Sequence, residues 1–147
     1  MDLLLWRHAD AEPGTRDLER DLTDKGRKQA QRVAEWLRER LPEDARILVS
    51  PANRAQQTAG ALTKSFATDA ALAPGADARD VLAAAGWPDA EGAVLVVGHQ
   101  PTLGRAAALA LTGTSEDWSV KKASVWWLSR RADGKALLRT VISPDLL

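Results

Sequence analysis

Short apolar runs of strand length alternate with amphipathic segments along this chain. Runs at residues 2–7, 45–50 and 92–98 predict three buried strands, and the last has no polar side chain. Residues 24–41 instead show the helical period, with charged and amide side chains on one face. The apolar positions on the other face are Ala30, Val33, Ala34, Leu37 and Leu41.

Capping residues predict where the first two helices begin and end. Thr23 can accept a hydrogen bond from the first turn of the first helix, and Pro42 ends that helix because it cannot continue one. Ser50 followed by Pro51 is typical of a second helix start, with serine as the N-cap and proline at the first helical position. We expect this second helix to run to about Phe66.

The second half of the chain predicts two more helices and a hairpin. Residues 80–87 form a short helix closed by a glycine, and a further helix runs from Pro101 to Gly113. The segments 123–130 and 136–143 are joined by an Asp-Gly turn and predict two paired strands. Strands that alternate with helices predict an α/β fold. We expect a three-layer sandwich with a mainly parallel central sheet flanked by helices and an antiparallel edge strand.

Composition narrows the possible functions. A length of 147 residues fits a single domain over residues 1–147. Lys and Arg number 20, as do Asp and Glu, so the zero net charge argues against nucleic acid or an anionic membrane as main partner. The absence of cysteine excludes disulfides, thiolate metal sites and cysteine nucleophiles. With no signal-like or membrane-spanning run, we expect a cytoplasmic protein without a cofactor.

Reactive and basic side chains follow three of the predicted strands. Arg7 and His8 end the first, Arg54 lies in the first turn of the helix after the second, and His99 follows the third. Because ligands of α/β sheets bind beyond the carboxyl ends of the strands, these side chains are expected to converge. Taken singly, a histidine at a strand end is more often structural than catalytic, and an arginine in the first turn of a helix is usually solvated. The chain has only two histidines, however, and both occupy this position on different strands.

Two guanidinium groups, two imidazoles and helix N-termini favour a doubly charged oxyanion. A phosphoryl group fits best, because the arginine fork matches its oxygens without a metal ion. With no cysteine, and no paired aspartates after a strand, a histidine is the remaining candidate nucleophile. The residues therefore predict a metal-independent phosphoryl-transfer site.

Four segments in chain order resemble the histidine phosphatase superfamily of phosphoglycerate mutase-like proteins. They are RHADAE (7–12), RDLTDKGRKQA (20–30), LVSPANRAQQTA (48–59) and VVGHQPTL (96–103). Together with LAPGAD (72–77) and the short chain, they are most similar to the SixA-type phosphohistidine phosphatase branch. The resemblance covers roughly two-thirds of the chain, and four ordered motifs are much more specific than Arg-His alone.

The resemblance implies a role for each candidate residue. His8 would be the nucleophile that becomes phosphorylated, and Arg7 and Arg54 would hold the phosphoryl oxygens. His99 would complete the pocket and stabilise the transition state, and Arg20 would add a further phosphate contact.

Two departures from the superfamily pattern bear on the substrate. Ala9 replaces the glycine that follows the nucleophile in much of the superfamily, as it often does in SixA-like members. The carboxylic acid that protonates an alkoxide leaving group in larger members has no clear counterpart. Asp77 and Asp80 lie in the corresponding region, but they fit equally well as charges at a helix start.

A missing acid favours a phosphohistidine substrate, since imidazole leaves far more readily than an alkoxide. The short chain also lacks inserted segments that would enclose a metabolite. We therefore expect a phosphohistidine phosphatase acting on a histidine phosphotransfer domain or a phosphocarrier protein. A small phosphatase for phosphoesters is the alternative, and a non-catalytic phosphate-binding module is a third.

Overall fold

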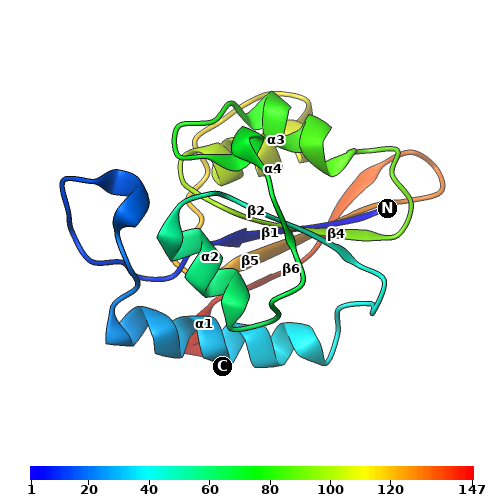
Figure 1. Cartoon of the computed structure of the whole chain (residues 1–147). Helices are drawn as coiled ribbons and strands as arrows, with labels where there is room; N and C mark the ends of the chain where they lie inside the picture. The colour runs from blue at the N-terminus through cyan, green and yellow to red at the C-terminus, as the bar shows by residue number, and fades with distance from the viewer.

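The computed structural model describes residues 1–147 as a six-stranded sheet between two layers of helices (Figure 1). The strands are β1 (Asp2–Arg7), β2 (Arg46–Val49), β3 (Ala67–Thr68), β4 (Ala93–Gly98), β5 (Val125–Arg130) and β6 (Ala136–Ile142). The helices are α1 (Asp24–Arg38), α2 (Asn53–Gly60), α3 (Ala78–Ala85) and α4 (Thr102–Thr112). Three short 3-10 turns are η1 (Asp17–Glu19), η2 (Ala70–Leu72) and η3 (Pro144–Leu146).

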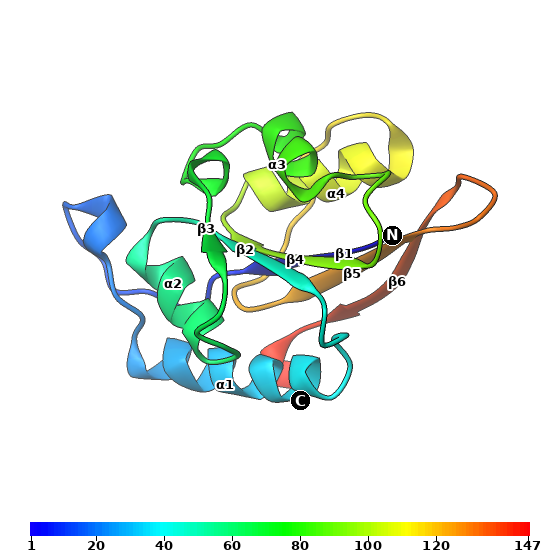
Figure 2. The ribbon, with the colours of Figure 1, turned by 45° about the vertical axis from the view of Figure 1, so that its right-hand side comes forward.

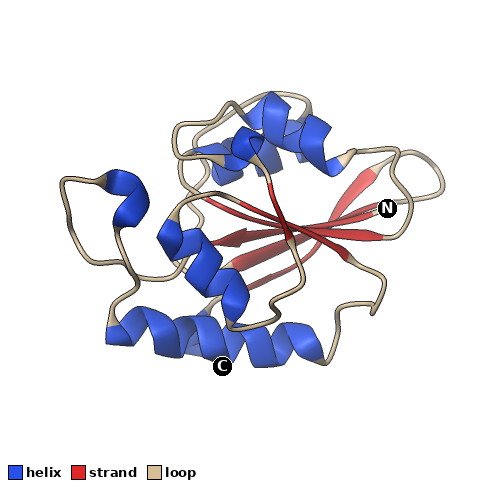
Figure 3. Ribbon diagram, in the orientation of Figure 1, coloured by secondary structure: helices blue, strands red, loops and turns tan.

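The strand order is β3-β2-β4-β1-β5-β6. Figure 3 shows the strands, in red, between the helices of the two layers. The pairings among β3, β2, β4 and β1 are parallel, and β5 pairs antiparallel with both β1 and β6. The predicted α/β sandwich with a mainly parallel sheet and an antiparallel edge is therefore confirmed. The predicted pairing of the two C-terminal strands is also confirmed.

Alternating residues of β1 bury both faces of the sheet. Leu4 and Trp6 belong to the core beneath α1 and α2, whereas Leu3 and Leu5 belong to the core beneath α3 and α4. Figures 1 and 2 show these helix pairs on opposite faces. A fully buried leucine contributes about 1.5–3 kcal/mol, so the central strands are rigid supports for whatever follows their carboxyl ends.

Helix α1 begins and ends close to where the sequence predicts. Thr23 Oγ1 accepts the Gly26 N–H at 2.9 Å as the N-cap, and the regular helix ends at Arg38. A side chain at Gly26 would collide with the carbonyl oxygen of Asp10, so glycine lets the first turn lie directly against the segment that follows β1. The helix start thereby holds the backbone just after His8 in place.

The prediction for the second helix was wrong at both ends. The helix begins at Asn53 with Ala52 as N-cap, and Ser50 Oγ instead contacts His99. It ends at Gly60, and the unpredicted β3 then pairs with β2. Local hydrogen bonds of hydroxyl side chains compete with helix formation, and parallel pairing with β2 extends the chain beyond the helix.

The remaining helices confirm the sequence predictions. Gly86 caps the C-terminus of α3 and Gly113 that of α4, both in the left-handed conformation that glycine adopts without strain. Trp126 and Trp127 pack on opposite faces of the sheet. No helix combines the length and the apolar character needed to cross a bilayer.

Candidate active site

Two parallel neighbouring strands bring the two histidines together at the carboxyl edge of the sheet. Arg7 of β1 is in register with Gly98 of β4, and the His8 N–H donates to Gly98 O at 3.0 Å. The rings of His8 and His99 are 5.1 Å apart between centroids. Both side chains are buried, at 7% and 4% relative exposure. The adjacent strand ends therefore fix the distance between the imidazoles.

His8 has a defined tautomer. Its Nδ1 lies 2.7 Å from Ala9 O, and a carbonyl oxygen can only accept, so Nδ1 carries the proton and Nε2 keeps a free lone pair. Burial lowers the pKa of His8 to about 4 against the raising effect of this hydrogen bond, and the charges of Arg54, Arg7 and Arg20 lower it further. The imidazole is neutral at pH 7 and can act as a nucleophile.

His99 is held by a serine on the neighbouring strand. Its Nε2 lies 2.7 Å from Ser50 Oγ, which also accepts the Ala52 N–H at 3.2 Å. A serine hydroxyl has one proton and two lone pairs, so this contact is compatible with either tautomer of His99. Nδ1 is buried and has no protein partner. Burial, with smaller effects of His8 and Arg54, lowers the pKa of His99 to about 3.

Arg54 enters the site from the first turn of α2, as the sequence predicts. Its side chain is only 5% exposed, and NH1 donates to the Asp17 carbonyl oxygen at 2.7 Å. Arg7 donates from NH1 to Val120 O at 2.9 Å, and burial lowers its pKa. The Nε atoms of both arginines are buried without a partner. His8, His99, Arg7 and Arg54 together form what we call the histidine pocket.

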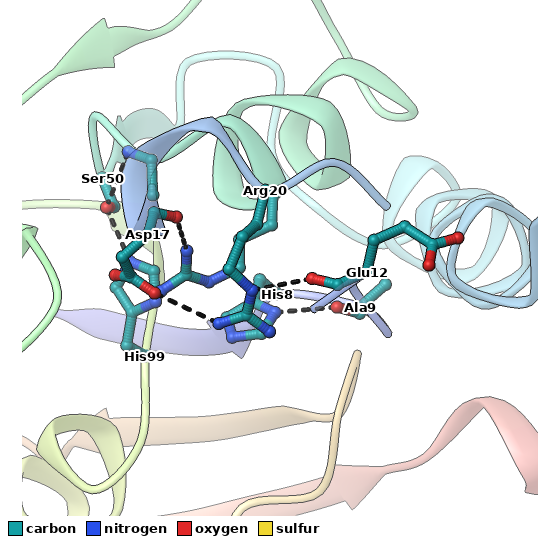
Figure 4. A network of polar contacts seen from close by, with 9 residues as sticks. His8, Ala9, Glu12, Asp17, Arg20, Ser50 and His99 are labelled. Atoms are coloured by element: carbon teal, nitrogen blue, oxygen red, sulfur yellow. Dashed lines mark hydrogen bonds and ion pairs between the residues drawn. The ribbon is translucent and has the colours of Figure 1, made fainter. Parts of the chain in front are cut away.

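Asp17 of η1 is a component of the site that no sequence pattern indicates. Its carboxylate lies 3.2 Å from Arg54 NH2 and 3.1 Å from Arg20 NH1 (Figure 4). Burial raises the pKa of Asp17, but the hydrogen bonds from Arg20 and Arg54 outweigh it and lower the pKa overall. One half-exposed carboxylate thus pairs with two arginines, and one positive charge of the three groups stays uncompensated.

Arg20 lies beside the pocket but is engaged with its own loop. Its Nε donates to Glu12 O at 2.7 Å (Figure 4), and its charge lowers the pKa of His8.

Ser50 is a second component of the site that sequence reasoning missed, because the Ser-Pro pair also fits a helix start. The signal that could have indicated Ser50 is its position: it is a polar residue directly after a buried strand, as His99 is.

The two acidic residues considered as general acids lie on α3. Asp77 is its N-cap and accepts the Arg79 N–H at 2.8 Å, which is the helix-start role left open by the sequence. Asp80 is exposed in the first turn, and neither carboxylate hydrogen-bonds to a histidine.

No group of three or more His, Asp or Glu side chains is arranged to hold a metal ion.

Solved structures of known proteins share this fold. The structure of the protein histidine phosphatase SixA complexed with tungstate matches over 99% of both chains, with 25% identity and a TM-score of 0.81. A candidate SixA phosphohistidine phosphatase from Agrobacterium tumefaciens matches over 97% of both chains, with 26% identity and a TM-score of 0.79. Its counterpart from Nakamurella multipartitia has 28% identity and a TM-score of 0.76, over 97% of this chain and 95% of that one. No curated protein matches the sequence significantly.

A family model gives the classification directly. The model described as histidine phosphatase superfamily (branch 1) matches residues 3–93, which is more than half of the chain. The matched segment contains His8 and Arg54, and the solved structures extend the similarity through β4 and His99. The chain therefore belongs to the histidine phosphatase superfamily, and this membership supports phosphatase activity.

Proposed function

We propose that the protein is a metal-independent phosphatase that dephosphorylates phosphohistidine on a protein through a phosphorylated His8. The observation that carries this proposal is the state of His8. Its Nδ1–H bond to Ala9 O leaves Nε2 as the free nitrogen, and its pKa of about 4 keeps that nitrogen unprotonated at neutral pH. A nucleophile needs both features.

The first chemical step transfers the phosphoryl group to His8. The Nε2 lone pair attacks phosphorus as the bond between phosphorus and the substrate imidazole breaks, and the leaving nitrogen takes up a proton from solvent. Arg54 and Arg7 stabilise the equatorial oxygens. His99 donates to one of them in the tautomer that carries its proton on Nδ1, the ring nitrogen without a protein partner. Water then attacks phosphohistidine 8 in the second step, which releases inorganic phosphate and restores the neutral imidazole.

Two further observations favour a phosphohistidine over a phosphoester. Neither candidate acid on α3 contacts the histidines, and imidazole leaves without the strong acid that an alkoxide requires. The protein histidine phosphatase SixA, similar over 99% of this chain, was solved with tungstate, an oxyanion with the tetrahedral shape of phosphate.

Trapping the phosphoenzyme tests this proposal. Protein mixed with a radiolabelled phosphohistidine peptide and quenched in base should carry an acid-labile, base-stable label, and turnover should persist in EDTA. His8→Ala should lose both label and turnover. His99→Ala should react more slowly but keep the label.

Each alternative has its own outcome in that experiment. Rapid hydrolysis of an aryl phosphate with none of the phosphohistidine peptide would favour a phosphoester phosphatase. Binding of tungstate without turnover of either substrate would indicate a binding module. Label retained in His8→Ala and lost in His99→Ala would assign the nucleophile to the other strand, and loss of turnover in EDTA would contradict the metal-independent mechanism.

A further inference from the structure

A basic cleft of about 690 Å³ lies beside the histidine pocket. One wall is formed by the first turns of α1, and the other by the segment before β5. The 3-10 turn η3 closes one end of the cleft. The C-terminal turn packs along α1 in both ribbon views (Figures 1 and 2). The cations that line the cleft are Arg7, Lys25, Lys28, Arg32, Lys121 and Lys122.

The positive charge of the basic cleft is largely uncompensated. Lys25, Lys28 and Arg32 lie three and four residues apart, so they share one face of α1, and none of them forms an ion pair. Lys122 pairs with Asp10 at 2.7 Å, and Asp145 is the one acidic residue in the lining. In a chain with 20 cations and 20 anions, this is a local excess rather than a general property of the surface.

Arg7 connects the basic cleft to the histidine pocket. Its side chain lines the cleft and donates to Val120 O, next to the two lysines of the opposite wall. Its positive charge also lowers the pKa of both His8 and His99. Arg7 is therefore common to the cleft and the histidine pocket, so groups that flank a phosphoryl group at His8 lie close to the cleft.

The lining specifies the chemistry of that ligand. Four of the six cations are lysines, and Arg32 is the one exposed arginine. Ammonium groups on flexible stems suit carboxylates at variable positions, whereas a fixed second phosphate is better held by a rigid arginine fork. No aromatic side chain lines the cleft, so it offers no stacking platform for nucleobases. The volume is within the range of ligand pockets and fits a few side chains of a protein segment.

We propose that the basic cleft binds acidic side chains that flank the phosphorylated residue of a protein substrate. This inference rests on the proposed function, because it describes what surrounds the phosphohistidine. The cleft attracts the acidic segment through long-range electrostatics, and the histidine pocket then performs the chemistry. Substrate selection therefore depends on residues that make no contact with the phosphoryl group.

Matched peptides test the inference. One phosphohistidine peptide carries glutamates on both sides, and its partner carries glutamines at the same positions. The wild-type protein should favour the acidic peptide at least tenfold in kcat/KM, and the preference should shrink as salt rises from about 0.05 M to about 0.3 M. The variant Lys25→Gln/Lys28→Gln/Arg32→Gln should lose most of the preference.

A charge-matched control separates the cleft from net charge. Arg46, Lys64 and Lys135 are exposed, form no ion pair and do not line the cleft, so the variant with all three changed to glutamine should keep the preference. Equal turnover of both peptides by the wild type, or equal loss of preference in the two variants, would overturn the inference.

Binding of the unphosphorylated peptides, followed by fluorescence anisotropy, keeps the inference separate from the proposed function. Preferential binding of the acidic peptide that is lost in the cleft variant supports the cleft even if no phosphohistidine is hydrolysed, in which case the proposed function fails instead. Tighter binding of a single-stranded oligonucleotide than of the acidic peptide would assign the cleft to nucleic acid and overturn the inference.

Discussion

The histidine pocket and the basic cleft share Arg7, but the polar groups of the pocket are buried and fixed, whereas those of the cleft are exposed and largely free. In the pocket, His8, His99 and Arg54 are at most 7% exposed, and hydrogen bonds to backbone or to Ser50 fix their orientation. In the cleft, all cations except the shared Arg7 are exposed, and most have no partner. Chemistry needs fixed donors in a site that excludes water, whereas recognition needs a field that reaches into solvent.

This contrast predicts which substitutions are tolerated in each region. A group that acts through its exact orientation cannot be exchanged for another of equal charge. A group that acts through charge alone can be exchanged for any other cation but not for a neutral residue. Four experiments follow from this distinction, in order of expected effect.

The largest effect is expected for Arg54. Arg54→Ala removes one oxyanion donor and should lower kcat about 10²- to 10³-fold. Arg54→Lys keeps the charge but loses the fork, so it should still cost more than about tenfold and weaken tungstate binding. In the basic cleft, Arg32→Lys should cost less than about threefold on the acidic peptide. Equal tolerance of lysine at both positions would remove the distinction between the regions.

The next effect is a pH dependence of stability that belongs to the histidine pocket. Both histidines titrate near 6.5 when unfolded, but the folded pKa is about 4 for His8 and about 3 for His99. Below pH 6.5 the unfolded chain binds protons that the folded state does not, so stability falls as pH falls. The loss between about pH 7 and about pH 5 should be about 2 kcal/mol per histidine.

Urea unfolding at the two pH values measures that loss. The variant His8→Gln/His99→Gln should show a shallower pH dependence, by the contribution of two histidines. The same slope in the variant and the wild type would mean that other groups cause the acid destabilisation and that the imidazoles are not desolvated.

The sequence predicted the strand ends that carry His8 and His99 and the helix start that carries Arg54, because buried parallel strands have a strong apolar signal and their carboxyl ends meet. The sequence did not predict the roles of residues whose side-chain partners are determined by tertiary contacts. Ser50 has the local composition of a helix cap, and only the position of β4 beside β2 turns its hydroxyl toward His99. Asp17 is 37 residues from Arg54, and no periodicity connects an exposed turn to a helix start.

Ser50→Ala tests whether the orientation of His99 matters independently of its presence. Loss of one buried hydrogen bond should lower kcat about tenfold while the label on His8 is still trapped. Nitrogen NMR of His99 should show a mixture of tautomers in the variant and one tautomer in the wild type. Ser124→Ala removes another buried hydroxyl, bonded to Ser143, and should leave kcat unchanged. An unchanged kcat in Ser50→Ala would show that packing alone orients His99.

The smallest effect is expected for Asp17, where the pocket meets solvent. Its carboxylate pairs with both Arg54 and Arg20, so an incoming oxyanion competes with it for the same cations. Exposed ion pairs contribute about 0.2–1 kcal/mol, and Asp17→Asn should therefore tighten tungstate binding roughly two- to fivefold in calorimetry. Glu19→Gln, on the same turn but paired with Arg16, should leave the affinity unchanged. Weaker binding in Asp17→Asn would mean that the carboxylate positions the arginines for the oxyanion rather than competing with it.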